Sequence, residues 1–250
     1  MLKTFPADLH IHTCLSPCAD EEMNPINILN MAKLLGTKII GICDHNTAGN
    51  IEAIKKASED YDILVLCGME VESVEEVHML CFFENIETIT KWQSFIYDHL
   101  PDRKNDVNIF GRQQLVDKNG NVIGEEERLL LTSTNLSVNE IAEKATEMGG
   151  LVIPAHIDRR AYSLLGQLGF IPEDLKISAL EFSRNASDSQ IKSILKLLHK
   201  DFALITSSDA HRLQEMVYQN TFFYLEAANF TEVSMAFRCL GGRKVEIKID

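Results

Sequence analysis

Short apolar runs rich in β-branched residues alternate along the chain with longer stretches in which apolar residues recur every three or four positions. The runs are typical of buried strands, and the longer stretches are typical of amphipathic helices. Such alternation predicts an α/β fold in which helices cover a parallel sheet or barrel. Strands are expected at Ala7–His12, Lys38–Cys43, Ile63–Val71, Val77–Phe83, Leu151–His156, Ala179–Phe182, Ala203–Ser207, Phe222–Leu225 and Lys244–Ile249.

Capping signals support the helix boundaries. Asn24-Pro25 and Ser137 are typical helix starts, and Gly36 and Gly149-Gly150 are typical stops. A chain of 250 residues has the usual length of one α/β barrel, so residues 1–250 are expected to form a single domain. The helices are expected at Ile26–Leu35, Ile51–Tyr61, Val138–Met148 and Ser189–His199.

Residues 86–135 depart from this alternation. They contain the only tryptophan, Trp92, and a turn signal at 117–120 between two short strand patterns, Gln113–Val116 and Val122–Gly124. Such a pattern predicts a hairpin. We expect this segment to be an insertion, a helix plus a hairpin, over the active-site mouth of the barrel.

The chain carries 24 Lys and Arg against 37 Asp and Glu, which is a formal charge of −13. This balance argues against a nucleic-acid polymer as partner and against an anionic membrane surface. The first residues show no signal-peptide pattern, and no apolar run approaches the roughly 18 residues of a membrane span. Six cysteines are too few for a disulfide scaffold. A cytoplasmic protein is therefore expected.

Most histidines and several carboxylates lie at or near the ends of the expected strands. In a parallel barrel these ends share the face where active sites form, and residues two apart on a strand project the same way. Imidazole and carboxylate together suit Zn, Mn or Fe, and the number of ligands suggests two or three divalent ions sharing a carboxylate. These residues are Asp8, His10, His12, Asp44, His45, Glu70, His78, His156, Asp209 and His211.

Each of these residues, taken singly, also has an ordinary structural explanation. His45 can be a loop residue and Glu70 a helix cap. The metal interpretation depends on their joint occurrence at five separate strand ends. His99 and His199 lie on helical patterns without partners, and we assign them structural roles.

The same residues form motifs that resemble the PHP (polymerase and histidinol phosphatase) family, over most of the chain outside residues 86–135. This resemblance implies a distorted (β/α)7 TIM-like barrel. The motifs are Asp8-Leu9-His10-Ile11-His12-Thr13, Cys43-Asp44-His45-Asn46, Gly68-Met69-Glu70, Val77-His78, Pro154-Ala155-His156 and Ser208-Asp209-Ala210-His211.

The resemblance also implies a ligand set for three ions. A first ion would be held by His10, His12, Glu70 and Asp209, a second by Glu70, His78 and His156, and a third by His45, His211 and a residue shortly after His12. Here the chain departs from the family pattern, because Cys18 stands where some relatives have histidine. A thiolate is a suitable Zn or Fe ligand, and Asp20 is the alternative.

These features predict a metal-dependent phosphoesterase acting on a small phosphorylated metabolite, such as a nucleotide or a sugar or amino-alcohol phosphate. Bound divalent ions lower the pKa of a bound water toward about 7. Glu70 and Asp209 are the expected catalytic carboxylates, with Asp44 orienting a ligand histidine. The arginines that follow strand ends are candidates to bind phosphate through paired donors. They are Arg159, Arg160, Arg184 and Arg212.

Two other functions fit part of the pattern. An amidohydrolase-like C–N hydrolase also begins with His-x-His on its first strand, but it usually bridges its metals with a modified lysine where this chain offers Glu70. A non-catalytic, metal-stabilised module associated with a polymerase is the second alternative, and the acidic charge balance disfavours it. The sequence leaves the substrate, the metal and the oligomeric state open.

Overall fold

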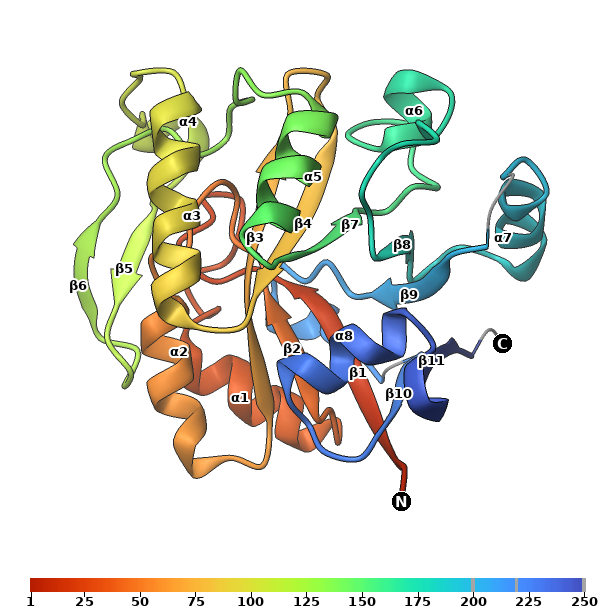
Figure 1. Ribbon diagram of the computed structural model, residues 1–250. Helices are drawn as coiled ribbons and strands as arrows, with labels where there is room; N and C mark the ends of the chain where they lie inside the picture. The colour runs from red at the N-terminus through yellow and green to blue at the C-terminus, as the bar shows by residue number, and fades with distance from the viewer. Residues whose placement is uncertain (199–200, 219, 249–250) are drawn as a thin grey trace.

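A computed structural model describes residues 1–198, 201–218 and 220–248 of the chain (Figure 1). The strands are β1 (Lys3–Ile11), β2 (Ile39–Ile42), β3 (Leu64–Glu72), β4 (His78–Phe83), β5 (Gln114–Val116), β6 (Val122–Glu125), β7 (Leu151–Pro154), β8 (Ala179–Ser183), β9 (Ala203–Ser207), β10 (Thr221–Leu225) and β11 (Lys244–Ile247). The helices are α1 (Pro25–Leu34), α2 (Ile51–Ala57), α3 (Ile86–His99), α4 (Val107–Phe110), α5 (Val138–Glu147), α6 (Leu164–Leu168), α7 (Asp188–Leu195) and α8 (Phe230–Phe237). Two sequence predictions, for His199 and Ile249, lie outside the described residues.

A seven-stranded sheet forms the centre of the molecule, in the order β11-β10-β1-β2-β3-β4-β7. A parallel pair, β8 and β9, forms a second sheet that packs against β7 and β1. The bridge between Ile11 and Ala210 joins β1 to the end of β9. The strands therefore curl into an incompletely closed barrel, with helices on the outside (Figure 1). The α/β prediction is confirmed, but the regular count of seven βα units is not.

The expectation of a parallel sheet is wrong for several strands. β1, β2 and β3 are parallel, whereas β4 runs antiparallel to β3 and β7 antiparallel to β4. Only residues 73–77 connect β3 to β4, and so short a connection permits a hairpin but no crossover. His78 therefore begins its strand, and it pairs with Glu72 at the end of β3.

The helix boundaries follow from local capping. Asn24 accepts a hydrogen bond from the Asn27 N–H, and Pro25 occupies the first turn of α1. Ser137 and Glu140 form a reciprocal capping box at the start of α5. These caps satisfy N–H groups that have no partner within the helix. Among the helices that the structure describes, none combines the length and apolar character needed to cross a bilayer.

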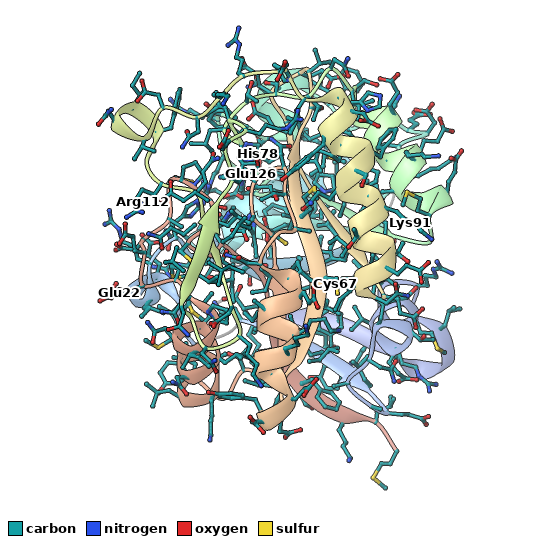
Figure 2. All side chains as sticks on the ribbon, turned by 90° about the vertical axis from the view of Figure 1, so that its left-hand side faces the viewer. Glu22, Cys67, His78, Lys91, Arg112 and Glu126 are labelled. Carbon is teal, nitrogen blue, oxygen red and sulfur yellow. The ribbon has the colours of Figure 1, made fainter. Side chains whose placement is uncertain are left out.

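Residues 86–135 form α3, α4 and the hairpin β5–β6 and pack beside the carboxyl end of β2. The hydroxyl of Thr47 contacts Gln93 and Tyr97 of α3, and Asn50 accepts a hydrogen bond from the Val116 N–H. Trp92 is fully buried, with its ring 5.5 Å from that of Phe83. Figure 2 views this side of the molecule, with α3 and the hairpin toward the reader.

Candidate metal centre

Imidazoles from four strands converge on one buried carboxylate. Glu70, near the end of β3, is 1% exposed, and its oxygens lie 2.8–3.5 Å from a nitrogen of each of five histidines. In the described part of the chain neither oxygen has a hydrogen bond of acceptable geometry. The five histidines are His10, His12, His45, His78 and His156.

Asp209 closes the other side of the cluster. Its Oδ1 lies 3.3 Å from His10 Nε2 and 3.2 Å from His12 Nε2. The ring of His211 stacks on His12 with centroids 4.0 Å apart, and its Nδ1 lies 2.9 Å from the Asp209 carbonyl. Residues from both ends of the chain thus meet at one rim.

The donor set fits divalent cations. Burial acts to raise the pKa of Glu70, but positive charge on His78, His10 and His45 lowers it well below its usual range. Burial likewise acts against ionisation of Asp209, yet His10 and His12 lower its pKa well below normal. Both carboxylates therefore stay charged. The buried charge of Glu70, whose oxygens lack good hydrogen bonds within the described residues, is costly unless a cation neutralises it.

Within the described residues there are three groups of side chains whose ligand atoms lie, inside each group, within 4.8 Å of one another. They are His10, His12 and Glu70; His45, Glu70 and His78; and His12, His45 and His211. Glu70 is common to two groups and His12 to two, so the groups form one continuous cluster. His45 shares one group with His78 and another with His211, and His156 reaches Glu70 at 3.5 Å.

Among the described residues, Cys18 contacts two histidines of this cluster, His211 and His45, and the Asp20 carboxylate does not. Cys18 is exposed at the rim. Partial burial acts to raise the pKa of its thiol, but hydrogen bonds with His211 and His45 lower it to about 6. The Asp20 carboxylate turns outward and lies 3.8 Å from Arg212. Of the two residues expected to complete the third site, the structure brings only the cysteine to the histidines.

Asp44 acts on the cluster through a serine. Its carboxylate accepts hydrogen bonds of 2.7 Å from the Thr13 N–H, the Thr13 hydroxyl and the Ser16 hydroxyl. The Ser16 oxygen lies 3.0 Å from Nδ1 of His12. We expected Asp44 to orient a ligand histidine without binding metal itself, and the structure places Ser16 between Asp44 and His12.

Glu181 is a site residue that the sequence reasoning missed. It is 1% exposed in β8, and its Oε2 lies 3.0 Å from His10 Nδ1 and accepts a 2.9 Å hydrogen bond from the His156 N–H. The available signal was a lone carboxylate in the apolar run Ala179–Phe182. No spacing rule connects it to the other motifs, because its partners come from other strands.

A cavity of about 260 Å³ opens onto the cluster. Its lining includes His45, Glu70, His78, His156 and Asp209 together with Arg159, Ala161, Tyr162 and His211. Within the described residues no part of 86–135 lines it. Arg159 Nη1 lies 2.7 Å from Asp209 Oδ2, and the Tyr162 ring stacks on His78 at 4.8 Å. The sequence offered no signal for Tyr162.

Three lining residues hold an unusual backbone. His156, Tyr162 and Asp209 have φ values of 31°, 56° and 51°. Positive φ costs a non-glycine residue about 1–3 kcal/mol and concentrates at functional sites. The strained backbone at this rim therefore marks it as a candidate functional site.

The other three arginines lie elsewhere. Arg160 is exposed and does not line this cavity. Arg212 is 66% exposed and faces Asp20. Arg184 donates to the carbonyl of Glu215 and lines a different cavity. Only Arg159 of the four predicted phosphate ligands adjoins the metal cluster.

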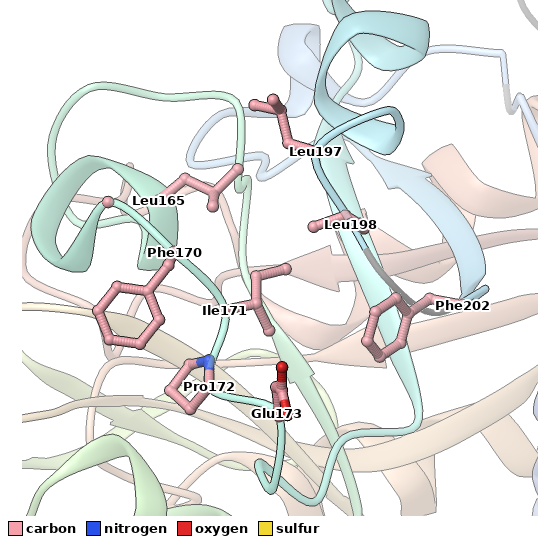
Figure 3. Close-up of a pocket in the computed structure, with 9 residues that line it drawn as sticks. Leu165, Phe170, Ile171, Pro172, Glu173, Leu197, Leu198 and Phe202 are labelled. Atoms are coloured by element: carbon pink, nitrogen blue, oxygen red, sulfur yellow. The ribbon is translucent and has the colours of Figure 1, made fainter.

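A further cavity of about 670 Å³ has an apolar lining and lies away from this chemistry. Figure 3 shows Phe170, Ile171, Leu197 and Phe202 around it, beside α6 and the end of α7. None of the predicted site residues lines it.

The sequence model of the PHP domain matches residues 8–202. Because this is most of the chain, the protein belongs to the PHP domain family. An uncharacterized Bacillus subtilis protein, YqxK, is 24% identical over 191 residues, which cover 72% of this chain and 43% of that protein.

Solved structures share the fold. The lesion-specific endonuclease Q from Pyrococcus furiosus has a TM-score of 0.75 and 23% identity, covering 97% of this chain and 58% of that one. An endonuclease Q complex with a 27-mer duplex carrying an abasic lesion at the active site has a TM-score of 0.73 and 22% identity, with the same coverages. This chain thus spans little more than half the length of these endonuclease chains.

These structures contradict one prediction from the sequence. We expected a small phosphorylated partner and argued against a nucleic-acid polymer, but the fold of this whole chain recurs in an enzyme bound to duplex DNA. The physical reason is that the formal charge of −13 is a sum over the chain. The field at a cleft depends on its own arginines and bound cations.

Proposed function

We propose that this chain is a metal-dependent phosphodiesterase that cleaves a nucleic acid. The observation that carries the proposal is the buried Glu70 carboxylate, which faces five imidazoles without a hydrogen bond of acceptable geometry in the described part of the chain. The fold shared with endonuclease Q supports a nucleic-acid substrate. The scissile bond would be a phosphodiester.

Two or three divalent ions of Zn, Mn or Fe would be held by His10, His12, Cys18, His45, Glu70, His78, His156, Asp209 and His211. When bound, they supply hydroxide at neutral pH and offset the negative charge of the phosphate. Glu70 is positioned between the groups and would be shared by two ions.

Arg159 would bind the scissile phosphate. Its side chain is 44% exposed, the residue lines the cavity, and its Nη1 lies 2.7 Å from Asp209 Oδ2. Because the other oxygen of Asp209 faces His10 and His12, this carboxylate ties the arginine to the metal cluster. A guanidinium presents paired donors that match phosphate oxygens, so the phosphate would be oriented against the ligands.

The direct test is cleavage of labelled oligonucleotides by protein loaded with Mn²⁺, Zn²⁺ or Fe²⁺. Single-stranded DNA, duplex DNA and a duplex with an abasic site should be compared. We expect shorter products with at least one of them, and the variant His78→Ala should be inactive. His99→Ala is the matched control, because His99 lies on α3 with its Nδ1 2.8 Å from the Phe95 carbonyl, away from the cluster. Intact oligonucleotides under all metals would refute the proposal.

A further inference from the structure

A second polar cavity, of about 250 Å³, lies at the same end of the strands as the metal centre. Its lining includes Arg184, Asn185, Thr206, Ser207, Ser208 and Asn220. Arg184 directly follows β8 and Ser208 directly follows β9, and these two strands are parallel. Ser208 precedes Asp209, which lines the cavity over the cluster. The two cavities therefore adjoin across the backbone of residues 208–209.

The chemistry of this second cavity, here called the Arg184 cavity, suits an anion. None of its described lining residues is acidic, although the chain as a whole carries a charge of −13. Among the described lining residues one side chain is charged, the guanidinium of Arg184, and others carry hydroxyl and amide groups. Arg184 Nη1 donates a hydrogen bond to the Glu215 carbonyl, and this bond positions the guanidinium. It uses one of the five N–H donors of the guanidinium. Such a set of donors binds phosphate oxygens well.

Ser207 borders the same cavity and, within the described residues, has an unpaired hydroxyl. The residue is 4% exposed, and in the described part of the chain its buried hydroxyl has no hydrogen-bond partner. The neighbouring Thr206 differs, because its hydroxyl lies 3.3 Å from that of Thr221. Buried hydroxyls are nearly always paired. Because the hydroxyl oxygen is itself buried, it would reach a ligand oxygen in the cavity only after a rotation about the Cα–Cβ bond.

The rim of the cavity is suited to the rest of a nucleotide. Tyr218 lines it and is 78% exposed. Exposed aromatic rings provide stacking surfaces for the bases of single strands. A phosphate at Arg184 would thus place the attached nucleoside toward an aromatic side chain.

We infer that the Arg184 cavity binds the phosphate next to the scissile phosphate on the same strand, so that the chain holds a polynucleotide at two successive phosphates. The inference rests on the proposed function, because a polynucleotide carries a second phosphate beside the first. Arg184, which lies away from the cluster, would then determine the preference of the enzyme for substrates with more than one phosphate.

Substrate length tests the inference. The dinucleoside monophosphate dTpT has one phosphate, and the tetranucleotide dTpTpTpT has neighbouring ones. We expect wild-type kcat/KM to be about tenfold higher for the tetranucleotide. Arg184→Gln should remove most of this advantage and Ser207→Ala should reduce it. Arg238→Gln makes the same charge change at an exposed residue beside Lys176 and Ala203, at the opposite end of the strands, and should keep the advantage. Equal losses of Arg184→Gln on both substrates would overturn the inference.

Binding separates this inference from the proposed function. Anisotropy of a fluorescent tetrathymidylate, measured in chelator so that no cleavage occurs, should show about tenfold weaker binding by Arg184→Gln and none of this loss for Arg238→Gln. Ser207→Ala removes a hydroxyl without a described protein partner, so its folded state should be retained and its binding weakened. If the protein cleaves no oligonucleotide, this difference in binding still supports phosphate binding at the Arg184 cavity. Equal binding by Arg184→Gln and wild type refutes it.

Discussion

The carboxylate of Glu181 lies against the ring of His10, with 3.0 Å between Oε2 and Nδ1. His10 belongs to β1 of the large sheet and Glu181 to β8 of the small one. The same oxygen accepts the His156 N–H. This contact therefore joins the two sheets directly beneath the candidate metal centre and sets the orientation of one imidazole.

Replacing Glu181 by glutamine should weaken metal binding about 10- to 100-fold, because partners that orient a ligand histidine typically contribute that much. Activity should recover at high metal concentration, since the ligands themselves remain. Metal titrations of activity and of intrinsic fluorescence would measure both effects. Glu143→Gln, which alters an exposed pair with Lys176, is the control. An unchanged titration of Glu181→Gln would exclude a positioning role.

Glu70→Gln should remove the negative charge that two of the ligand groups share. We expect activity to fall at least about 100-fold, and elemental analysis should find fewer ions per chain. Glu52→Gln changes an exposed residue paired with Lys56 and should match wild type. A full metal complement in Glu70→Gln would show that this carboxylate is not a ligand.

Removal of metal should lower thermal stability. An ion that binds only the folded chain at 100 times its Kd stabilises it by about 2.7 kcal/mol. For a domain of this size that corresponds to a Tm shift of about 5–10 °C. Scanning calorimetry in chelator should show this decrease, and added Mn²⁺ or Zn²⁺ should reverse it. An identical Tm in both conditions would contradict the assignment.

Asp44→Asn should destabilise the fold by about 1–3 kcal/mol. The amide that replaces one carboxylate oxygen cannot accept a hydrogen bond, so donors from Thr13 and Ser16 lose a partner in a buried place. Urea unfolding would measure the change in free energy. Asp62→Asn, at an exposed residue that pairs with Lys38, should have little effect. Equal stability of the two variants would contradict this prediction.

Gly68→Ala should destabilise the protein by about 1–3 kcal/mol through overpacking. A Cβ there would stand 2.6 Å from the Ile42 carbonyl oxygen and 2.7 Å from the Phe82 ring. Because Gly68 lies two residues before Glu70, we also expect weaker metal binding. Gly124→Ala has only a contact at 3.9 Å and should be nearly neutral, as unfolding experiments would show.

The secondary structure could largely be predicted because it depends on local patterns, and the candidate ligands could be named because their residue types at strand ends are also local features. Apolar periodicity places β9 at Ala203–Ser207 as expected, and the residue types at strand ends point to ligands that do converge. The direction of β4 was missed, because helix and strand periodicities carry no information on strand orientation. The similarity to a nuclease bound to duplex DNA was not anticipated, because the prediction relied on the summed charge of the chain. A summed charge does not describe the electrostatic field at a cleft.

The sequence by itself determined which residues form strands, which residues cap the starts of the helices, and which imidazoles and carboxylates are available to a metal. Only the tertiary structure decided that Glu181 supports His10, that Ser16 stands between Asp44 and His12, and that Arg159 rather than Arg212 reaches the cluster. The physical reason is that periodicity and capping act within a few residues of the chain. Contacts between distant strands depend on how the two sheets pack.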